Sequence, residues 1–227
     1  MPKQKQNLKN YGFVEPTITE DNHVLGGLST TTKKILCYDR NWIPFLPPGE
    51  VQHRRIETNS CTAFGTLNGI EALEKRVFGV VSDYSERAVA IGSGQSPQGN
   101  DPHKVAEYIR KSGLVIESKL PFDDTVDSFS TYMSPNPLPG NVTAGGKVWL
   151  QKYEFKHEWA FGSDYTLEEK QNALLQSLLY SPVGIAVCAW KKRGNIYVKD
   201  RTDRDNHWCL LVGGERGKSW KVLDSYV

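Results

Sequence analysis

The sequence predicts an α+β fold with two lobes, in which helices dominate the first half of the chain and strands the second. One observation is a stretch from 59 to 78 whose apolar residues recur at helical spacing. Another is a series of short apolar segments after Pro182, separated by glycine or charged turns, which is typical of strands. With 227 residues, 38% of them apolar, the chain can bury one core or two close-packed lobes.

The helix expected over 59–78 has a defined start and end. Asn59 or Ser60 can serve as its N-cap, and Gly79 follows the last apolar residue, where a C-cap belongs. Cys61 therefore falls in the first turn, where unpaired backbone N–H groups and the helix dipole favour a thiolate. The alternative is that Cys61 is a small buried residue that only packs.

Further helices are indicated by their capping residues. Asp101 and Pro102 open a helix that Gly113 ends, and a turn with a short helix follows Asp83. The glycines and prolines between 123 and 146 indicate mostly loop, and 148–155 alternates like a strand. Thr166 begins a capping box that opens a helix ending near Ser181. The strands expected after it are 183–190, 196–199, 208–213 and 220–224.

Residues 1–50 lack sustained periodicity and are expected to form an extended arm over the surface of the main domain. Prolines at 44, 47 and 48 exclude a regular helix at its end, while Trp42 and Phe45 require burial. The alternative is a blocking pro-segment. The main domain is expected over 51–227, with its helical lobe at about 51–125 and its β-rich lobe at about 126–227.

The composition excludes several classes of partner. The 28 basic and 26 acidic residues nearly balance, which gives no electrostatic case for nucleic acid or membrane binding. No apolar run is long enough to span a bilayer, and the polar start of the chain shows no export signal. The four cysteines are widely spaced, which suggests neither a zinc site nor a disulfide framework. We expect a cytoplasmic protein without cofactor or metal, and favour a monomer.

Thiol chemistry requires a base near the sulfur and a third group that orients the base. His207 stands at the start of the strand expected over 208–213, and Asp224 lies at the end of the strand expected over 220–224. If these two strands are neighbours, they can bring the imidazole and the carboxylate together. Taken singly, His207 could be a satisfied histidine at a strand edge and Asp224 a turn residue. The order Cys61, His207, Asp224 places the histidine 146 positions after the cysteine (207 minus 61), within the roughly 130–150 residues typical of papain-type enzymes.

Several motifs, in the right order over about residues 50 to 227, resemble those of the papain-like cysteine peptidases. They are Cys61-Thr-Ala-Phe, Tyr84-Ser-Glu-Arg, Gly99-Asn, Val115-Ile-Glu-Ser-Lys-Leu-Pro-Phe, Ser181-Pro-Val-Gly-Ile-Ala-Val and Leu223-Asp-Ser-Tyr. The chain departs from the family at Thr62, where an aromatic residue is usual, and at Asp224, which replaces the orienting asparagine. The overall pattern is closer to microbial or viral members than to lysosomal ones.

The resemblance implies a papain-like fold and a cysteine endopeptidase acting on peptides or proteins. It implies Cys61 as nucleophile, His207 as general base and then acid, and Asp224 as the group that orients the histidine. Gln52 is the candidate oxyanion donor, with Arg55 as the alternative, and the implied substrate-binding residues are Gly99, Asn100 and Asn206. Two other functions stay open: another Cys-His-Asp hydrolase or transferase, such as a cell-wall amidase or transglutaminase-like enzyme, and a catalytically silent binding or structural protein.

Overall fold

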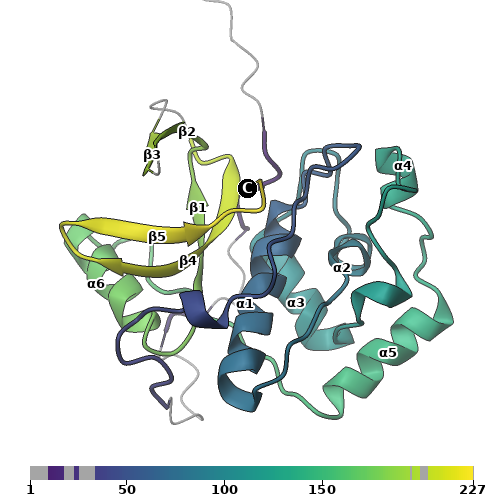
Figure 1. Ribbon diagram of the computed structural model, residues 1–227, viewed down its shortest axis with the longest axis horizontal. Coiled ribbons are helices and arrows are strands. Elements are labelled where there is room, and N and C mark those ends of the chain that lie inside the picture. The colour runs from purple at the N-terminus through teal and green to yellow at the C-terminus, as the bar shows by residue number, and fades with distance from the viewer. Residues whose placement is uncertain (1–9, 18–22, 26–33, 195, 200–203, 227) are drawn as a thin grey trace, which may run out of the picture.

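The structure is a computed structural model that describes residues 10–17, 23–25, 34–194, 196–199 and 204–226. The helices are α1 (Cys61–Phe78), α2 (Glu86–Gly92), α3 (Pro102–Ser112), α4 (Phe129–Tyr132), α5 (Gly140–Leu150) and α6 (Leu167–Ser177), with short 3-10 turns η1 (Ile43–Phe45) and η2 (Glu117–Lys119). The strands are β1 (Val183–Val187), β2 (Trp190–Arg193), β3 (Ile196–Lys199), β4 (His207–Glu215) and β5 (Ser219–Leu223). Figure 1 shows helices α1 to α5 on one side and the strands with α6 on the other, so the predicted α+β, two-lobed fold is confirmed.

The predicted ends of three helices are confirmed by their caps. Gly79 ends α1 in the left-handed conformation, with φ of 68°, which glycine adopts without strain. The Asp101 side chain accepts from the backbone N–H of His103 at the start of α3. Thr166 and Glu169 form the expected capping box of α6.

Helix α1 is the element that both lobes share. On one side Ala63, Leu67 and Ile70 form a core with residues of α3 and with Trp149 of α5. On the other side α1 packs against β4, the central strand of an antiparallel sheet with the order β1-β4-β5. The second lobe has its own core, which includes Trp42, Leu178 and Leu210.

The segment before α5 and α5 itself differ from the prediction. Instead of mostly loop over 123–146 and a strand over 148–155, the chain forms α4 and α5, and α5 packs against α3 of the helical lobe. The paired glycines that indicated a loop serve this contact, because a Cβ at Gly146 would lie 2.1 Å from the backbone oxygen of Ser112. The helical lobe therefore includes α5, although α5 lies after residue 126, where the β-rich lobe was expected to begin.

Residues 36–42 of the N-terminal arm lie against the β-rich lobe. The backbone N–H groups of Leu36 and Cys37 donate to Leu179 O, and that of Trp42 donates to Val212 O. The Trp42 side chain is fully buried, as its expected need for burial requires. Residues 1–9, 18–22 and 26–33 of the expected arm lie outside the described residues. Within the part of the chain that the structure describes, no helix is long and apolar enough to cross a membrane.

The helical lobe contains a cluster of buried carboxyl groups. The Glu71 side chain accepts from the backbone N–H of Tyr84 at 2.8 Å, yet its burial raises the pKa of Glu71 to about 9. Burial likewise raises the pKa of Glu117 to about 7, and that of Glu86 well above its ordinary range. Glu50 adjoins Glu86, and burial raises its pKa too. Ionising these groups in the folded protein is therefore unfavourable.

We expect the free energy of unfolding to fall as the pH rises from about 4.5 to 9. The folded-state pKa of Glu71 lies above its unfolded value of 4.5, so its contribution is fully present below pH 4.5 and is lost as the pH rises toward 9. One such group changes stability by at most about 1.4 kcal/mol per pH unit. Glu71→Gln keeps an oxygen that accepts from Tyr84 and should flatten this decline, which urea unfolding between pH 5 and 9 measures.

Glu107→Gln is the matched control. Hydrogen bonds from Arg110 hold the pKa of Glu107 at about 2, so its contribution is present above pH 4.5 and lost only as the pH falls toward 2. This variant should be less stable than the native protein at pH 8 and should keep the native slope between pH 5 and 9. Parallel profiles for Glu71→Gln and the native protein would contradict the role given to Glu71.

Candidate active site

Cys61 is the first residue of α1 and lies between the lobes. The Ser60 hydroxyl makes no cap bond to the helix and instead donates to the side-chain oxygen of Gln95 at 2.8 Å. The Cys61 side chain is fully buried, and this burial raises the pKa of its thiol well above the ordinary range. Backbone N–H groups of Trp208 and Thr62 at the sulfur act in the opposite direction but do not compensate. The expectation that the helix terminus favours a thiolate therefore fails in this form of the chain, because desolvation is the larger effect.

His207 and Asp224 are brought together by two paired strands. His207 begins β4, and β5 runs antiparallel beside β4 with Leu223 opposite Leu210, so Asp224 arrives next to the histidine. Nε2 of His207 lies 3.0 Å from Oδ1 of Asp224, and both side chains are buried. The backbone N–H of Tyr226 donates to the same Asp224 oxygen at 3.2 Å. Since Trp208 directly follows His207 and its N–H lies at the Cys61 sulfur, the thiol, the imidazole and the carboxylate share one site.

Gln52 lies at the same site, whereas Arg55 does not. The Gln52 amide nitrogen lies 2.8 Å from the Tyr226 hydroxyl and 3.4 Å from the backbone oxygen of Tyr11, and its oxygen accepts from Ser225 at 2.7 Å. The Arg55 side chain is exposed and donates to the backbone oxygen of Asp124. Of the two candidate oxyanion donors, only Gln52 is near the residues around Cys61.

The three candidate substrate-binding residues all contact a segment of the chain itself, residues 10–17. The backbone N–H of Tyr11 donates to Asn206 O at 3.0 Å. Asn100 donates to Gly12 O and accepts from the N–H of Val14, both at 3.0 Å, which makes a parallel bridge. Gly99 allows this approach, because a Cβ there would lie 1.9 Å from Gly12 O. Figure 1 shows the segment, in purple, close to the C-terminal end of the chain and to α1.

Aromatic side chains of this segment complete the site. The Tyr11 ring lies edge-on to His207 at 6.0 Å and to Tyr226 at 5.6 Å between ring centroids. Phe13 stacks on Trp208, with centroids 6.0 Å apart and planes inclined by only 4°. None of these four aromatic residues is predicted from the sequence to be part of the site. In the sequence, Trp208 directly follows the predicted His207, and Tyr226 lies two positions after the predicted Asp224. The residues around Tyr11 and Phe13 contain no predicted site residue.

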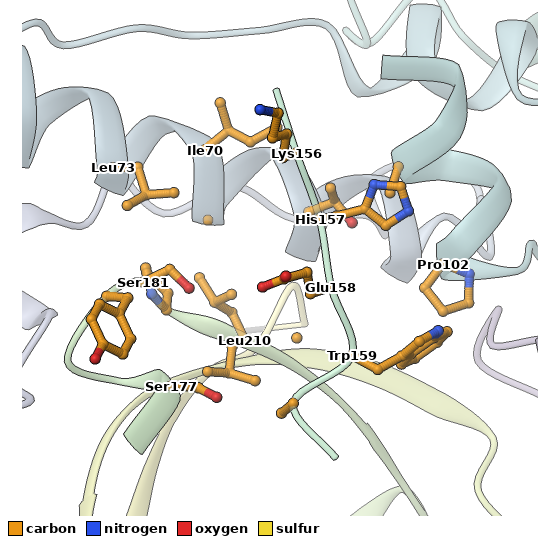
Figure 2. A pocket seen from close by; sticks show the side chains of 18 of the residues that line it. Ile70, Leu73, Pro102, Lys156, His157, Glu158, Trp159, Ser177, Ser181 and Leu210 are labelled. Atoms are coloured by element: carbon orange, nitrogen blue, oxygen red, sulfur yellow. The ribbon is translucent and has the colours of Figure 1, made fainter. Parts of the chain in front are cut away.

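A cavity of about 410 Å³ lies beside the site, between α1 and the β-rich lobe. Figure 2 shows the segment from Lys156 to Trp159 along it, with Ile70 of α1 on one side and Leu210 of β4 on the other. Trp208 also lines this cavity, so it belongs to both the cavity and the site. At the α3 side, Nε2 of His157 lies 3.2 Å from Nδ1 of His103. Among the described residues, no group of three or more histidine, cysteine or acidic side chains could hold a metal ion.

Comparison with known proteins supports the fold through structure alone. At the level of sequence, no family model and no curated protein matches the chain. The fold is similar to that of the Carica candamarcensis cysteine protease CMS1MS2 in complex with E-64, with a TM-score of 0.59 and 17% identity over 82% of this chain and 81% of that one. It is also similar to two digestive proteins of the Tenebrio molitor larval midgut. Procathepsin L2 proteinase has a TM-score of 0.59 and 16% identity over 96% of this chain and 68% of that one.

The second midgut protein, procathepsin L 3, has a TM-score of 0.55 and 16% identity over 87% of this chain. The chain spans 62% of its length, less than two thirds. These similarities confirm the predicted papain-like fold, and the matched structures are papain-like cysteine proteases. Their plant and insect origin gives no support to the expected microbial or viral subtype.

Proposed function

We propose that this protein is a cysteine endopeptidase with Cys61 as its nucleophile. The observation that carries the proposal is the buried hydrogen bond between His207 and Asp224 beside the Cys61 sulfur, on a papain-like fold. Because Asp224 engages Nε2 of the ring, proton exchange with the thiol is assigned to Nδ1. Asp224 then orients the imidazole and stabilises its charged form.

In the proposed reaction, His207 takes the thiol proton and the Cys61 sulfur attacks the peptide carbonyl carbon. The C–N bond breaks as His207 returns the proton to the leaving amine, which leaves a thioester on Cys61. A water molecule then gives its proton to His207 and attacks the thioester, which releases the carboxylic acid product and restores the thiol. No cofactor or metal takes part in these steps.

The negative charge on the carbonyl oxygen needs hydrogen-bond donors. We assign this role to the Gln52 amide and the backbone N–H of Cys61. The support is that the Gln52 amide nitrogen already lies 3.4 Å from a carbonyl oxygen, that of Tyr11. Removing one such donor in other enzymes lowers kcat by about 10²–10³.

The 10–17 segment acts, in this proposal, as a blocking pro-segment, which was the alternative to a simple arm. It occupies the backbone groups of Asn100 and Asn206 that an extended substrate would otherwise use, and Cys61 is fully buried in its presence. The described form is then the inhibited form, and displacing the segment exposes the site.

No disulfide joins the described cysteines, in keeping with the proposed cytoplasmic location. We also propose that the protein is a monomer and that its partners are peptide or protein substrates.

Labelling and cleavage together test the proposal. Full-length protein carrying Val14→Pro, which removes the N–H that Val14 donates to Asn100 O and so weakens binding of the blocking segment, is incubated with a peptidyl chloromethyl ketone. The adduct is located by peptide mapping, with Cys188 and Cys209 as internal controls. In parallel, a peptide library and peptidoglycan are offered as substrates. We expect an adduct on Cys61 and cleavage of peptides only. Cleavage of peptidoglycan would point to a cell-wall amidase, and an unlabelled Cys61 with no cleavage would point to a binding or structural protein.

A further inference from the structure

We infer that the helical lobe contains a second binding site, a groove that takes a carboxylate with an unbranched aliphatic chain. The groove has a volume of about 460 Å³ and lies between α2, the end of α3 and α5. Ligand sites in other proteins commonly have volumes of about 300–1,000 Å³. We call it the α5 groove. None of the described residues that line it belongs to the candidate active site, and Figure 1 shows α5 at the outer edge of the helical lobe, away from the strands.

The floor of the α5 groove is apolar and is held in place by the core. Val89 of α2, Leu114 and Val142 of α5 line the groove, and each is buried. Val89 and Leu114 belong to the core cluster that contains side chains of α1, and Val142 belongs to a neighbouring cluster with Ile91. Side chains packed in this way have fixed positions, so the floor does not need to form when a ligand binds. An aliphatic chain laid on this floor would be removed from water, which favours binding.

A close contact between two backbones brings two lysines to the rim of the groove. A Cβ at Gly146 of α5 would lie 2.1 Å from the backbone oxygen of Ser112, and one at Gly113 would lie 2.0 Å from the backbone oxygen of Gly146. Glycine at both positions allows this approach. Lys111 and Lys147 are the sequence neighbours of the contact, and both line the groove with exposed side chains.

The charge at the rim is positive. Lys111 forms an ion pair with Glu107 at 2.8 Å, but the same carboxylate pairs with Arg110 at 2.7 Å, so two cations share one negative charge. Lys147 forms no ion pair with any described residue. No acidic side chain is found among the described residues that line the groove. An anion at the rim would therefore meet an excess of positive charge.

A tyrosine hydroxyl supplies a further donor. A Cβ at Gly92 would lie 2.4 Å from the hydroxyl oxygen of Tyr108, so the ring lies directly over the backbone of α2. This hydroxyl forms no hydrogen bond within the part of the chain that the structure describes. Two ammonium groups and an O–H donor above an apolar floor fit an ionised carboxylic acid with an aliphatic chain. A short anion would leave the floor uncovered, and a neutral or cationic amphiphile would gain no ion pair at the rim.

Binding of simple amphiphiles to the native full-length protein tests the inference. Octanoate, decanoate, 1-decanol and decylamine are compared by isothermal titration calorimetry, each below the concentration at which it forms micelles. Each CH₂ group that enters an apolar site tightens binding by about fourfold, so decanoate should bind up to about 15-fold more tightly than octanoate. The ion pair should favour decanoate over 1-decanol by about two- to fivefold, and decylamine should bind most weakly.

Substitutions locate the bound ligand. Lys147→Glu should weaken binding of decanoate by about fivefold or more, because attraction becomes repulsion, and should leave binding of 1-decanol near the native value. Thr143→Trp, at an exposed position that lines the groove, should weaken binding of both ligands by filling the space. Lys152→Glu makes the same change of charge just beyond α5, at an exposed residue that does not line the groove, and should bind both ligands like the native protein.

The inference is overturned if decanoate does not bind, if octanoate binds as tightly as decanoate, or if 1-decanol does. It is also overturned if the Lys147→Glu protein binds decanoate as tightly as the Lys152→Glu protein, because the ligand then lies elsewhere. None of these measurements uses peptide cleavage, so their outcome is independent of the proposed function.

Discussion

Asp224→Ala is expected to lower kcat by about 10³–10⁴, because nothing then holds the His207 ring in the orientation and tautomer that exchange a proton with Cys61. In the structure, one oxygen of Asp224, Oδ1, orients the ring and lies 3.0 Å from Nε2 of His207. KM should change little, since Asp224 is buried and lies behind the histidine. Steady-state kinetics on peptides that the proposed library assay identifies as substrates would measure both quantities.

Asp224→Asn is the matched variant and should keep most of the activity. The backbone N–H of Tyr226 donates to Oδ1 at 3.2 Å, so an asparagine amide will turn its oxygen, and not its nitrogen, toward this N–H. The same oxygen then faces Nε2 of His207 and can accept from it. If the alanine and asparagine variants lose activity equally, the charge and not the acceptor matters. If neither loses activity, Asp224 is a turn residue.

Val14→Pro is expected to raise the activity of the full-length protein about 5- to 160-fold. Proline removes the N–H that Val14 donates to Asn100 O at 3.0 Å, which leaves a backbone oxygen unsatisfied whenever the segment is bound. Such a loss costs about 1–3 kcal/mol, which shifts the equilibrium toward the open site by the factor given. The rate of Cys61 alkylation by iodoacetamide should rise in parallel, because burial both covers the thiol and raises its pKa.

Val14→Ala serves as the control for this prediction. It keeps the backbone N–H and shortens only a side chain that is 37% exposed, so activity and alkylation should stay near those of the native protein. Equal rates for the proline variant and the native protein would show that the segment does not block the site in solution.

The elements that carry the reactive residues could be predicted because their signals are local. Caps define α1, α3 and α6, and a strand pair close in sequence brings His207 to Asp224. The order of the residues and their motifs then predicted a papain-like fold, which the structure confirms.

What the sequence could not predict depends on contacts between distant residues. The glycines of α5 are typical of a loop in the sequence, but in the structure they allow close contact between Gly146 and Ser112 of α3. Because this contact cannot be read from the sequence, α5 is not predicted and the strand expected over 148–155 is wrong. Tyr11 and Phe13 show no periodicity, and their partners Asn100, Asn206 and Trp208 lie far along the chain. The burial of Cys61 likewise depends on residues far from it in the sequence, such as Trp208, whose backbone N–H lies at the sulfur, so the raised pKa could not be foreseen from a position at a helix terminus.

The division of the site between two lobes has a mechanical consequence. The sulfur belongs to the first residue of α1, while the imidazole is held by β4 and β5 in the other half of the molecule. A displacement of about 1 Å between reacting groups can cost about a hundredfold in rate. If the proposed reaction takes place, a small sliding of β4 along α1 would therefore lower its rate while both halves stay folded. The rate would then depend on how rigidly the two halves are packed against each other.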